Sequence, residues 1–201
     1  MKNIIEHYRL ETLYKGKFVK ASLAKYTQNG NERDWEVVEA HDSVAILIYH
    51  TEHKSFVLVK QFRPAVYANN RDGMTIELCA GMVDKALTLR QIAVEEIEEE
   101  CGYRVPEEKV EKVTSFHTSV GFAGSRQTLY YTEVDETMRV SEGGGIDNEV
   151  IEVIELPTED ARALIFDESI AKTPGLMFAF MWWFDRTSIL QESDRFPVGS
   201  I

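Results

Sequence analysis

Five glutamates crowd into six consecutive positions near the middle of the chain: Glu95, Glu96, Glu98, Glu99 and Glu100. In an α-helix, Glu96, Glu99 and Glu100 share one patch, because they are spaced i, i+3 and i+4. Glu95 and Glu98 then face water. Like charges this close repel each other, and near a helix C-terminus they also meet the negative end of the helix dipole. Because hard carboxylate oxygens are preferred ligands of Mg²⁺, Mn²⁺ and Ca²⁺, the patch predicts a divalent metal site.

The segment around the glutamates carries the signals of a helix from about Leu89 to Cys101. Thr88, followed three residues later by Gln91, is a capping box, and Gly102 stands where a left-handed residue ends a helix. Two alternatives to a metal site stay open at this point. The glutamates can form a solvated acidic surface, or lysines and arginines from elsewhere in the chain can supply the positive charge.

Composition narrows the class of protein. A chain of 201 residues that is 44% hydrophobic can bury one good core, and a formal net charge of −12 argues against binding nucleic acid or an anionic membrane surface. The first residues are too polar for a signal peptide, and the apolar stretch 175–184 is too short to span a bilayer. We therefore expect a cytoplasmic protein. Cys79 and Cys101 lack the spacing of a zinc site and are expected to be buried thiols.

The rest of the chain alternates between strand and helix patterns, which predicts an α/β (α+β) fold with a mixed sheet flanked by helices. The predicted strands are 17–26, 35–40, 43–50, 55–62, 74–81, 109–119, 126–134 and 149–157, with a turn at 28–31. Helices are predicted at 158–166 and 175–190, and the aromatic side chains of the second are expected to pack in the core. We divide the chain into an N-terminal strand region, 1–40, and a main domain, 41–201.

A longer pattern surrounds the glutamate helix. The spacing G-x5-E-x7-R-E-U-x-E-E-x-G-U, in which U is aliphatic or aromatic, is typical of the Nudix hydrolases, and this chain resembles it. The matching residues are Gly81, Glu96, Ile97, Glu99, Glu100, Gly102 and Tyr103. Leu87 replaces the first glutamate and Glu95 replaces the arginine. Since those two positions would ordinarily pair with each other, the departures indicate the loss of one structural ion pair, not of metal ligands.

Further segments resemble the uridine diphosphate glucose pyrophosphatase branch of this family, over about residues 40–190. They are 60–68, 76–81, 124–128 and the glycines at 143–145. The resemblance implies an α/β/α sandwich, N-terminal antiparallel strands that form a homodimer, and Mg²⁺-dependent hydrolysis of a nucleotide sugar to UMP and sugar 1-phosphate, with Mn²⁺ as the alternative ion. Hydrolysis of ADP-ribose to AMP and ribose 5-phosphate is the alternative reaction. A Nudix module that binds a nucleotide without cleaving it, and a structural interaction protein, are the alternatives outside enzymes.

The resemblance also implies roles for single residues. The metal would be held by Glu96, Glu99 and Glu100 with the Ala80 carbonyl, and Glu77 would bind a water on the metal, unless it is an outward-facing strand residue. A guanidinium fork fits diphosphate oxygens, so Arg63 is the expected diphosphate ligand and Arg126 the weaker candidate. Glu149, after a glycine-rich segment, is the expected general base, and Glu152 is the alternate.

Overall fold

The computed structural model describes residues 3–17, 19–146 and 150–195. The chain divides into two compact units. The first comprises residues 1–43, 82–84 and 115–127, and the second comprises 44–81, 85–114 and 128–201. The first unit thus takes in two later segments besides the N-terminal strands. The glutamate helix belongs to the second unit.

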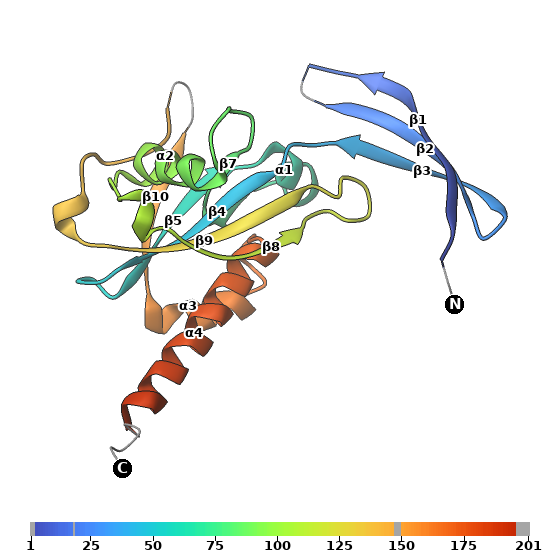
Figure 1. Ribbon diagram of the computed structural model, residues 1–201. Coiled ribbons are helices and arrows are strands. Elements are labelled where there is room, and N and C mark those ends of the chain that lie inside the picture. Colours follow the sequence, from blue (N-terminus) through green and yellow to red (C-terminus); the bar gives the residue numbers. More distant parts are fainter. Residues whose placement is uncertain (1–2, 18, 147–149, 196–201) are drawn as a thin grey trace, which may run out of the picture. The chain divides into compact units, whose positions relative to one another are not determined.

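The first unit contains a three-stranded antiparallel sheet in the order β1-β2-β3 (Figure 1). Its strands are β1 (Ile5–Lys15), β2 (Lys20–Gln28) and β3 (Asn31–Glu39). Asn29 and Gly30, both with positive φ, form the two-residue turn between β2 and β3, as is typical of Asn-Gly hairpins. The sequence predicted this turn, but it did not predict β1, which is exposed along its whole length.

A second sheet has seven strands, five of them in the order β10-β5-β4-β9-β8, with β6 paired to β5 and β7 paired to β4. The strands are β4 (Ser43–His50), β5 (Ser55–Phe62), β6 (Met74–Glu77), β7 (Cys79–Met82), β8 (Glu111–His117), β9 (Arg126–Val134) and β10 (Ile151–Pro157). Strands β4 and β5 are almost continuously buried, which is why they read as apolar runs and not as alternating patterns.

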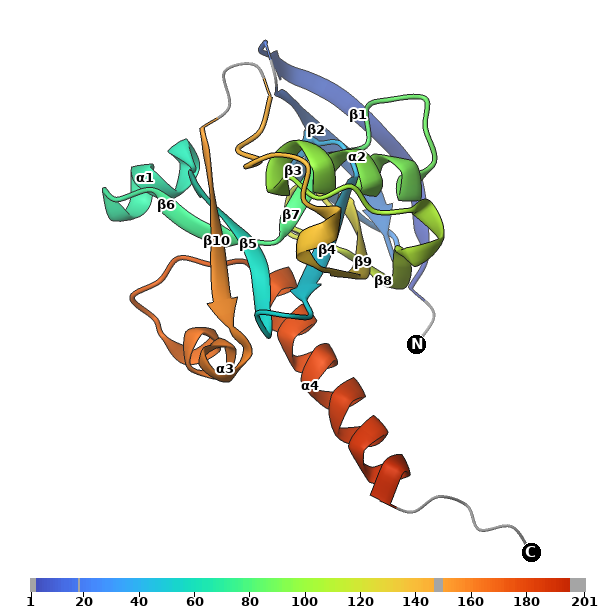
Figure 2. The ribbon, with the colours of Figure 1, turned by 90° about the vertical axis from the view of Figure 1, so that its left-hand side faces the viewer.

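Helices accompany this sheet: α1 (Pro64–Asn70), α2 (Leu89–Cys101), α3 (Thr158–Phe166) and α4 (Pro174–Arg195), with the short 3₁₀ turns η1 (Glu107–Lys109) and η2 (Glu136–Met138). Figures 1 and 2 show α2 on one side of the sheet and α3 and α4 on the other. This arrangement confirms the predicted mixed α and β architecture.

Helix α2 begins and ends at the predicted residues, and the predicted capping residues stabilise its two ends. Thr88 Oγ1 accepts a hydrogen bond from the Gln91 N–H, the Gln91 side chain accepts one from the Thr88 N–H, and Gly102 is left-handed at φ 79°. Helix α1, in contrast, lies between the predicted strands 55–62 and 74–81, where the sequence predicted no helix. Pro64 opens it, because proline suits the first turn of a helix and removes a donor that a strand would need.

Aromatic side chains join α4 to the sheet, as predicted. The Phe180 ring lies 4.7 Å from that of Phe56, and the Trp183 ring lies 5.2 Å from that of Tyr49. Cys79 and Cys101 are fully buried and unbridged, which confirms the expectation for both thiols. None of the helices that the structure describes is long and apolar enough to cross a membrane.

Candidate functional site

Glu95 and Glu98 of the glutamate cluster are paired with basic side chains. Glu95 Oε2 accepts a hydrogen bond from Lys85 Nζ at 2.8 Å, and Glu98 receives Arg104 through two hydrogen bonds of 3.0 and 2.7 Å. Glu95 stands where the Nudix pattern has an arginine, and Lys85 now completes a different ion pair there. The hydrogen-bonded partners of Glu95 and Glu98 are thus Lys85 and Arg104, and the charge of Lys85 also interacts with those of Glu99 and Glu96.

Glu100 is a carboxylate held inside the protein. Only 6% of the residue is exposed, and its Oε2 accepts a hydrogen bond of 2.9 Å from the N–H of Ala80 on β7. Burial raises the pKa of the neighbouring Cys79 thiol, and Cys101 and Glu100 raise it further. A buried carboxylate therefore lies beside a neutral thiol at this site. The hydrogen bond from Ala80 holds Glu100 against β7.

Glu96 lies against the same strand, at Gly81. A β carbon on Gly81 would overlap the Oε1 and Cδ atoms of Glu96. The carboxylate of Glu96 therefore occupies the space that a side chain at position 81 would fill. Helix α2 and strand β7 therefore bring Glu96 and Glu100 to adjacent backbone positions, Gly81 and Ala80. The carboxylate beside Gly81 and the buried carboxylate of Glu100 can both serve as oxygen ligands of a divalent cation.

We expect Gly81→Ala to lower activity far more than stability. The overlapping atoms belong to the flexible end of the Glu96 side chain, so Glu96 can swing away at small cost to folding. Because misplacing a reacting group by about 1 Å can cost roughly 100-fold in rate, we expect a fall of about 10- to 100-fold in kcat/KM with a nearly unchanged unfolding midpoint. Gly121→Ala is the matched control, since a β carbon there meets nothing within 4 Å. Wild-type turnover by Gly81→Ala would contradict this role of the glycine.

The C-terminal end of α2 is covered by the triple glycine. The N–H of Gly145 donates to the Glu99 carbonyl at 3.1 Å, and the N–H of Gly144 donates to the Glu100 carbonyl at 2.8 Å. These donors bind helix carbonyls that would otherwise lack partners and offset the negative end of the dipole. Glu99 itself is half-buried on the helix. Sequence reasoning took the glycines for a loop and missed that they bind the helix of the glutamates.

Arg63 and Glu77 bind each other. Arg63 Nε and Nη2 donate to the two oxygens of Glu77, both at 2.7 Å, and Thr75 Oγ1 adds a hydrogen bond of 2.6 Å to Glu77 Oε1. Glu77 is buried, so the outward-facing strand glutamate considered from the sequence is wrong. Burial alone would raise the pKa of Glu77, but the hydrogen bonds from Arg63 and Thr75 outweigh burial and lower it.

This pairing predicts a dependence of stability on pH. Because the pKa of Glu77 is lower in the folded protein than its ordinary value of 4.5, the ion pair stabilises the fold above that pH and is lost as pH falls through the lower folded pKa. We expect Glu77→Gln to cost about 1–3 kcal/mol at pH 7, and the difference from wild type to narrow in acid. Thermal unfolding at a series of pH values measures this difference in stability. Glu142→Gln, which breaks an exposed pair with Arg139, is the control, and equal pH profiles for all three proteins would refute the assignment.

The remaining candidate residues are Arg126, Glu149 and Glu152. The Arg126 N–H donates to the Asp42 carboxylate at 2.8 Å, and both residues belong to the first unit. Glu149 lies outside the described residues. Its alternate, Glu152, forms an ion pair of 3.2 Å with Lys60 across β10 and β5.

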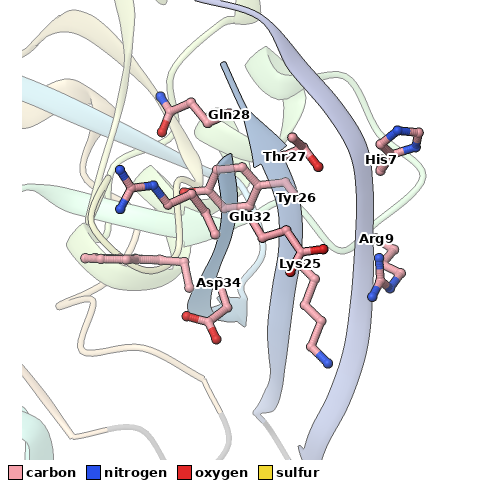
Figure 3. Close-up of a pocket in the computed structure, with 10 residues that line it drawn as sticks. His7, Arg9, Lys25, Tyr26, Thr27, Gln28, Glu32 and Asp34 are labelled. Carbon is pink, nitrogen blue, oxygen red and sulfur yellow. The ribbon is translucent and has the colours of Figure 1, made fainter. Parts of the chain in front are cut away.

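The first unit also has a hollow of about 640 Å³ on its three-stranded sheet (Figure 3). Its lining residues are His7, Arg9, Lys25, Tyr26, Thr27, Gln28, Glu32, Arg33, Asp34 and Trp35. Two of these lining residues, Tyr26 and Trp35, are aromatic. In the second unit, the ring of Tyr67 on α1 lies 5.5 Å from that of Phe62.

Comparison with known proteins bears on the part of the chain that carries the glutamate helix. The model of the NUDIX domain matches residues 39–173. The chain is 39% identical over 188 residues to the uridine diphosphate glucose pyrophosphatase NUDT14 of Bos taurus, covering 79% of this chain and 85% of the relative. It is 38% identical over 198 residues to the same enzyme of Mus musculus, covering 84% and 89% of the two chains. The GDP-mannose pyrophosphatase of Cronobacter sakazakii is 43% identical over 130 residues, covering 63% of this chain and 65% of the relative.

Proposed function

The chain belongs to the Nudix family and is a hydrolase of pyrophosphate bonds, and we propose that it splits a nucleotide sugar of the UDP-glucose type into UMP and sugar 1-phosphate. The observation that carries the proposal is the placement of Glu96 and Glu100 against the backbone of Gly81 and Ala80. The similarity to the UDP-glucose enzymes extends over more of the chain than the similarity to the GDP-mannose enzymes, which supports the choice of sugar nucleotide.

In this proposal Glu96, Glu99 and Glu100 hold Mg²⁺, with the carbonyl of Ala80, and Mn²⁺ is the alternative ion. When bound, the ion supplies charge neutralisation on the diphosphate oxygens. The half-buried and buried positions of these carboxylates support the assignment, because cation binding relieves their repulsion. We propose that Glu77 acts through Arg63 and not on the ion, since both its oxygens already accept hydrogen bonds from the guanidinium.

Arg63 is the proposed ligand of the diphosphate. Glu77 holds its guanidinium from one side, and the Arg63 side chain is 46% exposed, so a substrate can reach it from solvent. Fixing a guanidinium before the substrate arrives lowers the entropy lost on binding. Arg126 remains the second candidate for this role.

Glu149 is the proposed general base, and the described residues on both sides of it support this. Gly145 is bound to the Glu99 carbonyl, and Ile151 pairs with Gln61, two residues before Arg63. The chain from Gly145 to Glu149 is short and can span at most about 14 Å. In the proposed reaction Glu149 takes a proton from water, the water oxygen bonds to phosphorus, and the bond from that phosphorus to the bridging oxygen breaks.

A panel of substrates tests the proposal. Purified protein is incubated with UDP-glucose, GDP-mannose and ADP-ribose in the presence of Mg²⁺, and products are identified by chromatography and phosphorus NMR. We expect UDP-glucose to give the highest kcat/KM. Preference for ADP-ribose would establish the alternative reaction, preference for GDP-mannose would change the sugar nucleotide, and binding without turnover would establish a non-catalytic module.

We also propose a homodimer formed through the N-terminal strands, in the cytoplasm. The three-stranded sheet of the first unit leaves large apolar side chains exposed, which indicates a covered surface. These are Ile5, Tyr8, Leu10, Leu13, Tyr14 and Trp35, and Ile4, just before β1, is exposed as well. Light scattering after size exclusion measures the mass, and a monomer at micromolar concentration would refute the dimer.

A further inference from the structure

A group of two histidines and a glutamate lies outside the glutamate patch of α2. His50 ends β4, His53 lies in the turn to β5, and Glu136 begins η2. The Nε2 atoms of His50 and His53 lie 3.3 Å and 3.8 Å from the same atom, Glu136 Oε1. Each residue offers one ligand atom, and these atoms lie within 4.8 Å of one another. All three residues belong to the second unit.

His50 presents a polar atom that lacks a hydrogen bond. The residue is fully buried, and its Nδ1 accepts a hydrogen bond of 3.2 Å from the His53 N–H. Its Nε2, although near Glu136, has no hydrogen-bond partner within the part of the chain that the structure describes. A buried polar atom without a partner is unfavourable, and once the ring proton sits on Nδ1 a cation can satisfy the lone pair of Nε2.

His53 is oriented by a second carboxylate. Its Nδ1 lies 2.8 Å from Glu155 Oε2, which also accepts a hydrogen bond of 2.8 Å from Ser55 Oγ. A carboxylate oxygen accepts hydrogen bonds, so we assign the ring proton of His53 to Nδ1, which leaves Nε2 with the lone pair that a metal needs. A carboxylate that orients a histidine in this way is the usual support of a metal ligand.

The two rings lie face to face beside Glu136. They are stacked, with centroids 3.9 Å apart and planes 10° from parallel. One divalent cation with nitrogen and oxygen ligands satisfies both imidazoles and the carboxylate. In a tetrahedral zinc site with bonds of about 2.0–2.1 Å, neighbouring ligand atoms lie roughly 3.3 Å apart, which is the spacing of His50 Nε2 and Glu136 Oε1.

We propose that His50, His53 and Glu136 bind one Zn²⁺ ion, which joins the β4–β5 turn to η2. Imidazole nitrogens favour zinc over magnesium, so this site differs in metal from the carboxylate patch. Binding requires that the rings tilt apart and that His50 moves its proton to Nδ1, which gives up the bond from the His53 N–H. The side chains of His53 and Glu136 are 43% and 46% exposed, so the ion enters from solvent and water can take the fourth position.

Calorimetry on the chelator-treated full chain tests the site, with excess Mg²⁺ present to occupy the helix carboxylates. We expect wild type to bind one equivalent of Zn²⁺, and His53→Gln and Glu136→Gln to lose this binding. Both changes are at exposed side chains, which protects folding. His41→Gln and Glu142→Gln are the controls and should bind as wild type. Glu155→Gln should weaken zinc affinity by about 10- to 100-fold, because it removes the carboxylate that orients His53.

Nitrogen NMR of the imidazoles identifies the ligand atoms. On addition of Zn²⁺ we expect the Nε2 resonances of His50 and His53 to shift, while Nδ1 of His53 stays protonated against Glu155. Zinc binding that survives both His53→Gln and Glu136→Gln would overturn the proposal. Absence of a zinc-specific heat in excess Mg²⁺, or NMR shifts confined to the remaining histidines, would also overturn it.

Discussion

Replacing Glu99 by glutamine is expected to lower kcat/KM on the preferred substrate by roughly 10²- to 10³-fold, the usual effect of removing one group that stabilises charge in a transition state. Glu99 is half-buried on α2 between the positions of Glu96 and Glu100, and glutamine keeps its size while removing its charge. The dependence of rate on Mg²⁺ should shift to higher concentration. Steady-state kinetics over a range of Mg²⁺ concentrations measures both effects.

The same helix supplies the control for Glu99→Gln. Glu98 is the preceding residue, but its carboxylate is bound to Arg104. Glu98→Gln should therefore keep turnover and Mg²⁺ dependence close to wild type, with a small loss of stability. If the two variants lose equal activity, the loss reflects a general effect on the helix and Glu99 is not a metal ligand. Thermal unfolding shows whether both proteins remain folded.

The second large effect is expected for Glu149→Gln. A general base contributes about 10²- to 10⁴-fold to rate, so kcat should fall by that factor while KM changes little. The wild-type rate should decrease on the acid side as the base becomes protonated, and the variant should lack this acid limb. Rates measured between acid and neutral pH at saturating Mg²⁺ give both the loss and the change of profile.

Glu152→Gln is the matched variant for this test. Glu152 is the alternate base, and in the structure its carboxylate pairs with Lys60. We expect Glu152→Gln to retain the activity and the acid limb of wild type. If Glu152→Gln shows the loss and Glu149→Gln does not, the base is Glu152. Wild-type profiles for both would mean that neither residue takes the proton from water.

The position of the glycine loop connects these two predictions. Gly144 and Gly145 bind the carbonyls of Glu100 and Glu99, so the end of the glutamate helix and the start of the segment that carries Glu149 are one hydrogen-bonded assembly. If Glu99 holds the ion and Glu149 is the base, as proposed, substitutions at the two residues are not independent. A double variant, Glu99→Gln with Glu149→Gln, should lose less activity than the product of the two single losses.

Local patterns were enough to predict features that depend on neighbours along the chain. The capping box at Thr88 and the left-handed Gly102 define α2, and Asn29 and Gly30 define a hairpin, because each involves backbone groups that are close in sequence. The i, i+3, i+4 spacing likewise groups Glu96, Glu99 and Glu100 before any fold is known.

Only the tertiary structure decided which polar side chains from distant segments become partners. Arg63 and Glu77 are brought together by the pairing of β5 with β6, and the spacing of residue types along the chain carries no sign of it. Likewise His50 and Glu136 come from distant segments that meet only after the sheet forms. The physical reason is that periodicity records which face of an element is apolar, whereas a contact between polar groups depends on strand register and on where loops return.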